Sequence, residues 1–358
     1  MRYDVVIAGA GLAGACAALW LSQTHRVCVL EKGAPGSGAS GAAAGLVNPF
    51  MGRKAKRAWR ADGALGALHA TLDAADAAGL FHASGVLRPA ESILQAEAFC
   101  AVAAFHPDKA RWHTREDVEE RWPGVRARHG ALAVLEGGHV VLPDLIAALL
   151  RSAEANGATV QTGAGLSGWE TAAEGVAAMT ESGERVEGER LLLALGAGFG
   201  AFPELAALPL HRVKGQTAVL SRPTGVPPDL PPLSGGSYIV PGTDGLVVGA
   251  TFEHHFATRA PTPETGPTLR EKAAALLPAL AGADVLEVRA GIRVTVPSFR
   301  LPLLGPLPRQ PHVWVFTGLG AKGLLTAPLL AHRLARFFDV PTDIPVQVST
   351  LRLGAGAV

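Results

Sequence analysis

The chain has 358 residues, of which 48% are hydrophobic and 18% are charged, and its formal net charge is +1. This composition allows a large core and is not typical of disordered chains, while the balanced charge excludes a bulk attraction to nucleic acid or to a membrane. Three cysteines without metal or disulfide spacing favour a reducing, cytoplasmic setting.

The first segment predicts a β-α-β unit rather than a signal peptide or a membrane span. Residues 5–21 are almost entirely apolar, but Asp4 precedes them and glycines interrupt them at a fixed spacing. The pattern predicts a strand over 3–8, a helix over 12–23 and a strand over 27–30. When a helix joins two such strands, the strands pair in parallel and the crossover is right-handed. We expect no membrane partner.

The turn before this helix reads Gly-Ala-Gly-Leu-Ala-Gly over residues 9–14. In such a pattern Gly9 permits the tight turn, Gly11 lets a diphosphate approach the backbone, and Gly14 lets the helix pack on the strand. The helix N-terminus offers free N–H groups and a positive dipole end to phosphate. Glu31 ends the second strand, where a carboxylate accepts hydrogen bonds from a ribose diol. We predict a dinucleotide site, for NAD or FAD, at Gly9, Gly11, Leu12, Ala13, Gly14, Glu31 and Lys32.

A run of Gly, Ala and Ser over residues 33–45 is either a flexible linker or a loop whose backbone approaches a ligand. Beyond it, residues 62–78 have a helical pattern, and short extended stretches with Pro and Gly punctuation follow from residue 83 onward. The sequence then predicts a helix over 142–156 and strands over 158–161 and 190–195.

The second half of the chain predicts mainly strands. Those over 211–221, 237–240, 246–251 and 285–292 adjoin one another through short turns, which favours an antiparallel sheet. A last buried strand over 312–317 leads through a turn into a helix over 324–338. We therefore predict an α/β fold with two domains that interleave in sequence. A Rossmann-type nucleotide domain with a parallel sheet takes residues 1–82, 138–208 and 290–358, and a smaller substrate domain with a mainly antiparallel sheet takes residues 83–137 and 209–289.

Four segments of the chain carry a family resemblance. They are the N-terminal unit, the loop 39–45, the strand pair 238–241 and 245–251, and the C-terminal stretches 290–293, 301–305, 318–324 and 327–328. With these segments the chain resembles the D-amino-acid-oxidase-like family of FAD oxidoreductases, which includes glycine and sarcosine oxidases. The resemblance implies FAD as the cofactor, bound non-covalently because no cysteine lies in the C-terminal segments.

The same resemblance implies further cofactor contacts in loops that follow strands. The N–H groups at the start of the last helix would face the flavin's pyrimidine edge, where a dipole end favours the reduced ring. The implied contacts are Ser40, Ala44, Gly45, Leu46, Gly165, Gly196, Gly318, Gly320, Ala321, Lys322, Gly323 and Leu324.

Amine oxidation by a flavin requires the protein mainly to position the substrate and to tune the ring. Arg293 matches the family's substrate arginine, whose guanidinium binds a carboxylate in a bidentate manner, although an ion pair with Glu287 is an alternative. Tyr238 matches the family's active-site tyrosine, the alternative being an ordinary half-buried aromatic residue. Lys322 would stabilise the reduced ring or pair with the carboxylate, unless it is a solvated lysine at a helix start. These residues predict oxidation of a small carboxylated amine, such as glycine or sarcosine.

Two other functions stay open. The chain is similar to the oxidoreductase half of a bifunctional tRNA-modifying family in its loop reaching Asn48-Pro49 and in residues 318–324, although Lys322 replaces an arginine and the methyltransferase half is absent. This similarity implies removal of a carboxymethyl group from a wobble uridine. The other alternative is an FAD-dependent hydroxy-acid dehydrogenase.

A basic run follows the predicted flavin loop. Its cations suit the phosphates of tRNA, and Trp59 among them suits its bases, but a rim that binds substrate carboxylate or a solvated helix face are alternatives. The cations of this run are Arg53, Lys54, Lys56, Arg57 and Arg60.

The histidines at 254 and 255 lack a third ligand at a suitable spacing, so no metal is expected.

Overall fold

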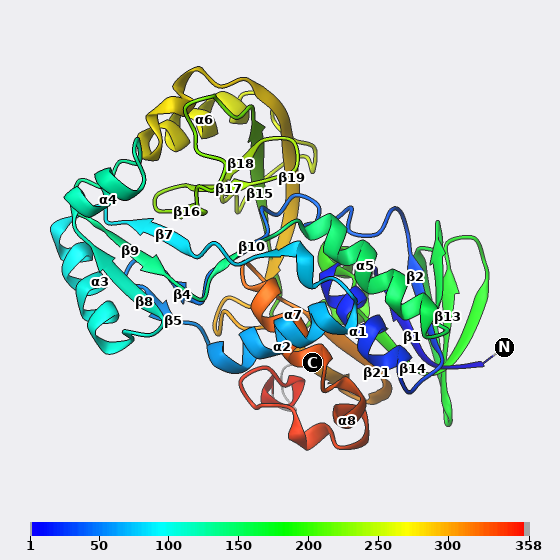
Figure 1. Ribbon diagram of the computed structural model, residues 1–358. Helices are drawn as coiled ribbons and strands as arrows, with labels where there is room; N and C mark the ends of the chain where they lie inside the picture. The colour runs from blue at the N-terminus through cyan, green and yellow to red at the C-terminus, as the bar shows by residue number, and fades with distance from the viewer. Residues whose placement is uncertain (1, 354–358) are drawn as a thin grey trace.

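The computed structural model describes residues 2–353 and begins with the expected β-α-β unit (Figure 1). Strand β1 (Arg2–Ala8), helix α1 (Leu12–Ser22) and strand β2 (Val27–Glu31) lie within two residues of their predicted bounds. The two strands are parallel neighbours, with Ala8 opposite Leu30. The carboxyl ends of both strands therefore meet at the edge of the sheet where the glycine-rich turn lies.

The first large sheet has a parallel centre, and two antiparallel additions branch from one side of it, beyond β14. Its parallel strands lie in the order β11-β2-β1-β14-β21, and β20 pairs with β21 in the antiparallel sense. The hairpin β12–β13 pairs with the first half of β14, on the same edge where β21 pairs with its second half. The further strands are β11 (Thr159–Thr162), β12 (Leu166–Ala172), β13 (Gly175–Thr180), β14 (Arg185–Leu193), β20 (Leu303–Leu307) and β21 (Gln310–Thr317).

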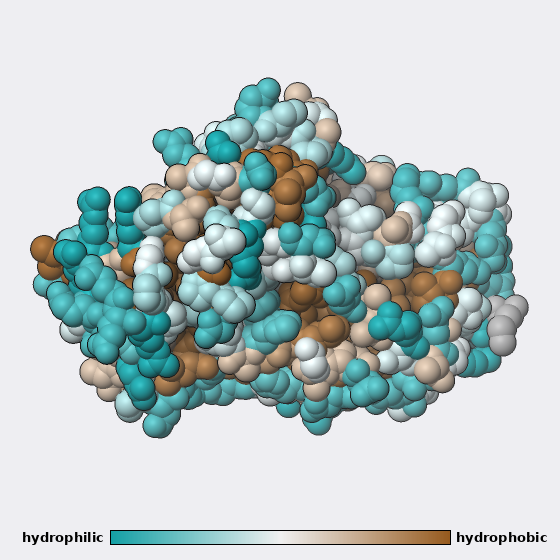
Figure 2. All heavy atoms as spheres, turned by 45° about the horizontal axis from the view of Figure 1, so that its top comes forward, coloured by the Kyte–Doolittle hydropathy of each residue, from teal (hydrophilic) through white to brown (hydrophobic). Residues whose placement is uncertain are grey.

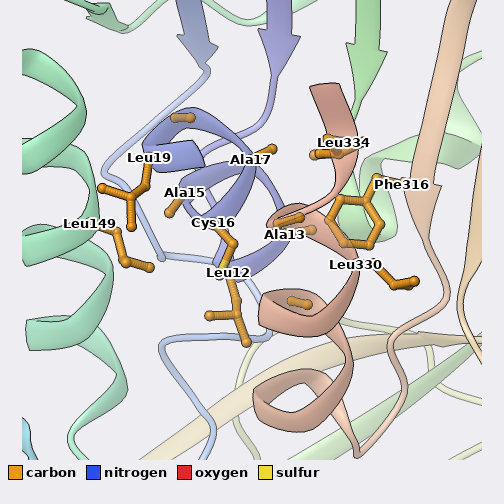
Figure 3. Packing of buried hydrophobic residues seen from close by; sticks show 14 of the residues in the cluster. Leu12, Ala13, Ala15, Cys16, Ala17, Leu19, Leu149, Phe316, Leu330 and Leu334 are labelled. Atoms are coloured by element: carbon orange, nitrogen blue, oxygen red, sulfur yellow. The ribbon is translucent and has the colours of Figure 1, made fainter. Parts of the chain in front are cut away.

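Helix α1 lies in the centre of the main core, and every one of its residues except Trp20 is buried. Its small residues allow close approach by two neighbours, α5 (Leu142–Ala155) and α7 (Gly323–Ala331). Figure 3 shows Leu149 on one side of α1, and Phe316 and Leu330 on the other. The apolarity that resembles a membrane span thus reflects burial on all sides. Within residues 2–353 no helix is long and apolar enough to cross a membrane.

The second large sheet is antiparallel except where β16 and β7 pair. Helix α6 (Thr265–Leu276) packs on β15, and α3 (Ile93–Phe105) packs on the other end of the sheet, as Figure 1 shows. The order of strands is β19 (Val285–Thr295), β15 (His211–Leu220), β18 (Leu246–Gly249), β17 (Tyr238–Pro241), β16 (Leu233–Ser234), β7 (Val86–Pro89), β9 (Ala131–Val134) and β8 (Ala110–His113). The predicted α/β class, with a parallel sheet and a mainly antiparallel sheet, is confirmed.

The division into domains stays a prediction. All strands of the first sheet come from the segments assigned to the nucleotide domain, whereas β19 runs across the predicted boundary between residues 289 and 290. Residues 1 and 354–358, at the ends of that predicted domain, lie outside the described part of the chain.

On the face drawn in Figure 2, hydrophobic residues lie in separate patches among hydrophilic ones.

Two short sheets connect the large ones. The first contains β3 (Leu46–Val47), β10 (Gly138–Val140) and β6 (Phe81–His82). The second is a hairpin of β4 (Phe50–Met51) and β5 (Lys56–Arg57). Strands β3 and β4 come soon after the Gly/Ala/Ser loop in the sequence, so this loop leads from the first large sheet towards the second.

The extended stretches expected after residue 83 are wrong over two segments, which form α3 and α4 (Arg115–Arg121). Both helices begin at a side-chain cap. Ser92 accepts a hydrogen bond from the backbone N–H of Gln95, and Thr114 forms a capping box with Asp117. These Ser-x-x-Gln and Thr-x-x-Asp patterns are helix-start signals that the hydrophobic pattern had concealed.

Three predicted elements have wrong extents. The helix expected over 324–338 is divided into two: α7 ends at Ala331, and α8 (Leu334–Asp339) starts after a turn. Pro328 inside α7 lacks an N–H group and weakens the helix there. The helix expected over 62–78 is α2 (Ala61–Ala74), followed by a separate 3₁₀ turn. The strand expected over 190–195 is longer at its start, where it pairs with the unpredicted hairpin β12–β13.

Candidate active site

The turn after β1 admits only glycine at two positions. Gly9 has a φ of +104°, and a Cβ atom built on it would overlap the carbonyl of Ala194. A Cβ atom on Gly14 would overlap the carbonyl oxygen of Gly9. The helix, the turn and β14 are therefore packed backbone against backbone, as a dinucleotide-binding turn requires.

The start of α1 has the free donors that a diphosphate needs. Gly11 is the N-cap and supplies no side-chain cap, and the first turn holds no acidic residue. Of these N–H groups, that of Leu12 donates to the hydroxyl of Ser40 at 3.2 Å. Ala13 lies within the same first turn. Unfilled N–H groups at the positive end of the helix dipole suit an anion.

Glu31 is fixed at the end of β2 by its neighbours' backbone. Its carboxylate accepts hydrogen bonds from the N–H groups of Ala10 at 2.7 Å and Gly33 at 2.9 Å. Lys32 is directed away, since its Nζ atom bonds Glu181 at 2.6 Å. The N–H of Glu181 in turn donates to the carbonyl of Gly165, which places that glycine in the same region. The donors around Glu31 suit a carboxylate that binds a ribose diol.

The Gly/Ala/Ser loop is held against the second large sheet and against the short sheet that contains β10. The Thr217 hydroxyl of β15 donates to the carbonyl of Ala42 at 3.0 Å, and a Cβ atom on Gly291 of β19 would lie 2.8 Å from Cα of Ala39. Gly45, with a φ of +72°, lies against the Val140 carbonyl of β10. Ala44 and Leu46 flank this glycine. These contacts favour a ligand loop over a flexible linker.

The C-terminal glycine-rich turn lies beside the N-terminal one. Gly318 and Gly320 have positive φ values of 74° and 57°. A Cβ atom built on Gly323 would lie 3.1 Å from Cδ2 of Leu12, so the starts of α7 and α1 are in contact. Lys322 is the N-cap of α7 and supplies no side-chain cap, so N–H groups are free there too. Ala321 and Leu324 flank this start, and Gly196 begins the segment that follows β14.

These features fit an FAD molecule that extends from the first turn to the second. The first turn offers donors for the diphosphate, Glu31 suits the ribose, and the N–H groups of α7 suit the reduced ring's negative edge. Which residues contact FAD stays a prediction.

Arg293 of β19 lies at the centre of a second cluster. Its Nη2 atom donates to the carbonyl of Thr251 at 2.7 Å, and its guanidinium lies 4.4 Å from the ring centroid of Phe252. Glu287 is paired with Arg289 on the same strand, so it is not the partner of Arg293. Arg293 has no ion pair within residues 2–353. A desolvated guanidinium without a counter-charge is poised for a carboxylate.

Tyr238 of β17 reaches the same cluster. A Cβ atom on Gly249 would lie 2.7 Å from the phenol oxygen and 3.0 Å from Cγ2 of Thr217. Burial raises the pKa of Tyr238 to about 12, and the positive charge of Arg293 opposes this shift. The phenol therefore keeps its proton at neutral pH and is able to donate a hydrogen bond beside Arg293.

A polar network behind Arg293 was not predicted from the sequence. The Thr251 hydroxyl donates to Glu253 at 2.6 Å, and Gln216 donates to the same carboxylate at 2.8 Å. Lys214, only 2% exposed, has its Nζ atom 3.9 Å from Glu253. Lys214 and Gln216 alternate on β15, which is the one signal in the sequence that two polar side chains share a face. The network fixes the backbone that holds the guanidinium.

Lys322 lies next to the turn that joins the two clusters. Its Nζ atom is 3.5 Å from the carbonyl of Arg300, and burial, followed by the charge of Arg300, lowers its pKa. The N–H of Gly320 donates to the carbonyl of Val294 at 2.9 Å. The turn therefore contacts the residue that follows Arg293 in β19. The structure thus brings Arg293, Tyr238 and the Lys322 turn together, while their catalytic roles stay predictions.

Gly215→Ala is expected to raise the KM for carboxylated amines roughly tenfold with little change in folding. A Cβ atom at this position would overlap Nη2 of Arg293, a flexible side-chain end that must then leave its site. Gly225→Ala, where nothing lies within 4 Å, is the matched control in steady-state kinetics and thermal melts. An unchanged KM in the Gly215 variant would contradict a substrate role for this guanidinium.

The basic run forms an exposed hairpin with one member withdrawn. Arg53, Lys54 and Lys56 are exposed, and none has an ion pair within residues 2–353. Arg57 differs, since it is bonded to Asp62 and Glu136 and its side chain is 17% exposed. The charge of Arg57 is therefore already neutralised by two carboxylates, and its predicted contact with RNA phosphates stays a prediction.

A buried arginine holds this hairpin in place. Arg88 donates to the carbonyl oxygens of Phe50 at 2.6 Å and Gly52 at 2.7 Å, and it stacks on Phe99. The free cations of the hairpin are thus presented on an ordered turn.

His254 stacks on His211, and no group of three or more potential metal ligands occurs in the described part of the chain.

Comparison with known proteins agrees with this geometry. The family model named DAO, described as FAD dependent oxidoreductase, matches residues 4–337. A glycine oxidase from Pseudomonas aeruginosa is 30% identical over 94% of this chain and 94% of its own length. The crystal structure of glycine oxidase from Geobacillus kaustophilus superimposes with a TM-score of 0.82 at 26% identity, covering 94% of this chain and 95% of that chain.

A second group of relatives is longer. The tRNA 5-methylaminomethyl-2-thiouridine biosynthesis bifunctional protein MnmC from Maricaulis maris is 31% identical over 92% of this chain. The match covers 51% of that protein, so the chain spans about half the length of this relative.

Proposed function

The chain belongs to the DAO family of FAD-dependent oxidoreductases, and from this premise we propose that it oxidises the C–N bond of a small amine that carries a carboxylate, of the glycine or sarcosine kind. The observation that carries the proposal is the half-buried guanidinium of Arg293, which is oriented by Thr251 and lacks a carboxylate partner within residues 2–353. Burial lowers its pKa, so a substrate carboxylate would relieve the cost of a desolvated charge.

In this proposal the chain's residues position the substrate. Arg293 binds the carboxylate through its guanidinium fork, and the protonated phenol of Tyr238 donates a second hydrogen bond to it. When bound, FAD supplies the acceptor for the hydride of the carbon beside the neutral amine. The amine nitrogen's electron pair then forms an iminium, which water hydrolyses to a carbonyl compound and an amine. Lys322, at the start of α7, adds positive charge at the edge where negative charge develops.

We propose that FAD is held non-covalently. Cys16 and Cys28 are buried in the core, and burial raises the pKa of both thiols, while Cys100 lies on α3 at the other side of the molecule (Figure 1). A thiol that stays protonated is a poor nucleophile for attachment. Acid precipitation of the purified protein is expected to release all flavin absorbance into the supernatant; flavin that pellets with the protein would contradict this.

Anaerobic mixing with a panel of amino and hydroxy acids tests the reaction. Glycine or sarcosine is expected to bleach the flavin absorbance near 450 nm in a single turnover, because the ring accepts two electrons from the amine. Hydroxy acids of similar size serve as the matched control and are expected to leave the absorbance unchanged. Bleaching by a hydroxy acid alone would establish the hydroxy-acid alternative, and no bleaching by any amine would end the proposal.

A second candidate function is oxidation of a carboxymethylaminomethyl group on tRNA. The cationic hairpin of Arg53, Lys54 and Lys56, held in place by Arg88, favours it, as does the similarity to the bifunctional relatives. Such a substrate is itself a glycine-like secondary amine, so the same site would serve both reactions. The two functions therefore differ in partner and not in chemistry.

Replacing the three hairpin cations by glutamine separates these functions. Under the tRNA function, affinity for tRNA in filter binding is expected to fall by about tenfold or more. With fewer cations on the hairpin, fewer counterions are released from the tRNA phosphates on binding. Turnover of free glycine is expected to stay unchanged. The matched control replaces three other exposed cations, Arg111, Arg259 and Lys272. Equal loss of affinity in both triple variants would exclude the hairpin as a specific tRNA surface.

A further inference from the structure

Two histidines outside the Arg293 cluster lie side by side next to the flavin loop, and Arg222 is near enough to act electrostatically on one of them. Leu46, His139 and His82 lie opposite one another on β3, β10 and β6, so their side chains form a row on one face of this small sheet. On the other face Val47 and Val140 pack into the main core. The row therefore faces away from α1, and it begins at a residue of the predicted flavin loop.

The two histidines are stacked and incompletely bonded. Their ring centroids lie 4.6 Å apart, with an interplanar angle of 12°. His139 is only 6% exposed, and its buried Nδ1 atom has no hydrogen-bond partner within the described residues. A buried polar atom without a partner is rare and costly, which indicates a missing group at this place. His82 is exposed, so the pair is reached from solvent.

Arg222, in the loop after β15, supplies the third basic group. Its Nη1 atom donates to the carbonyl of Pro227 at 2.8 Å, and its other guanidinium N–H groups form no hydrogen bond within residues 2–353. Burial lowers the pKa of His139 to about 4, and His82 and Arg222 act in the same direction. None of Arg222, His82 and His139 forms an ion pair with a carboxylate within residues 2–353.

We propose that Arg222, His82 and His139 form a binding site for an oxyanion, namely a carboxylate or phosphate group. A guanidinium and two imidazole N–H groups supply the charge-assisted hydrogen bonds that such a group accepts, and the orphan nitrogen obtains a partner. The oxyanion comes either from the far end of an extended amine substrate, a source that rests on the proposed function, or from free phosphate. The position beside Leu46 suits the first source, because a substrate held at the flavin would extend along this loop.

Binding of inorganic phosphate and of acetate to the flavin-loaded protein tests the site without turnover. Titration followed by NMR of the imidazole Cε1–H groups is expected to shift the signals of His82 and His139 with saturation. Arg222→Gln and His139→Gln are expected to weaken binding at least tenfold. Arg111→Gln, which removes an exposed arginine of the second sheet, is the matched control and is expected to bind normally. Absence of saturable shifts with both anions would overturn the proposal.

Kinetics then separates the two sources. Glycine and N-(carboxymethyl)glycine share a reacting group, but the second compound has an additional carboxylate. If the site binds substrate, Arg222→Gln raises the KM of N-(carboxymethyl)glycine alone, by about tenfold, and leaves that of glycine unchanged. If it binds free phosphate, Arg222→Gln leaves both KM values unchanged, although the wild-type protein still shows the saturable NMR shifts with phosphate. Failure of the amine reaction itself would remove only this second measurement, because the titration needs no turnover.

Discussion

Gly14→Ala is expected to yield a protein that does not retain flavin. The added Cβ atom would overlap the carbonyl oxygen of Gly9, a backbone atom that moves only if the whole turn moves. Because the same turn presents the N–H groups for the diphosphate, its displacement removes the donors as well as the packing. The free energy of unfolding is expected to fall by about 3 kcal/mol, the upper range for overpacking.

Gly66→Ala is the matched control for this substitution. Gly66 lies in α2, and a Cβ atom there meets nothing within 4 Å. Alanine is the better helix former, so this variant is expected to gain roughly 0.5–1 kcal/mol of stability and to keep its flavin. The ratio of absorbance at 450 nm to that at 280 nm, with thermal melts, measures both effects. Full flavin content in the Gly14 variant would show that the cofactor does not depend on this turn.

The parallel half of the fold was predictable because its signals are local. The apolar strand, the glycine pattern and the acidic residue at the end of β2 all lie within residues 3–31. In this order the three features together predict a β-α-β unit that binds a dinucleotide. The hairpin β12–β13 and helix α3 were missed for opposite reasons. The first is short and exposed at one end, and the second is an apolar helix in which only Phe99 is buried, so its hydrophobic residues show no face.

The candidate site was predictable only where residue type and motif coincide. Arg293 and Tyr238 were identified by family resemblance, and the structure adds that they lie together across strands that are not adjacent in sequence. The support of Arg293 by Thr251 and Glu253 depends on a turn of the chain after β18, which no spacing in the sequence reveals. Nor does the sequence indicate that Arg57 is paired with Glu136, since the two are far apart along the chain.

Arg293→Met is the variant expected to have the largest effect on catalysis. A charge-assisted hydrogen bond contributes about 1.5–3 kcal/mol, so kcat/KM for glycine or sarcosine should fall by roughly 10- to 150-fold. The loss should appear mainly as a higher KM, because the carboxylate is held in the ground state as well as in the transition state. Arg293→Lys keeps the charge but loses the planar fork, and it is expected to recover only part of the loss.

Arg289→Met provides the comparison that separates a substrate role from a structural one. Arg289 lies on the same strand as Arg293, but it is already neutralised by Glu287 and is partly exposed. It is therefore expected to leave the KM unchanged, whereas a general disturbance of β19 would raise the KM in both variants. An amine without a carboxylate adds a second check, since Arg293→Met should not weaken its turnover. If the KM for glycine is unaffected in Arg293→Met, the guanidinium is not the carboxylate-binding group, and the phenol of Tyr238 would be left as the anchor to test.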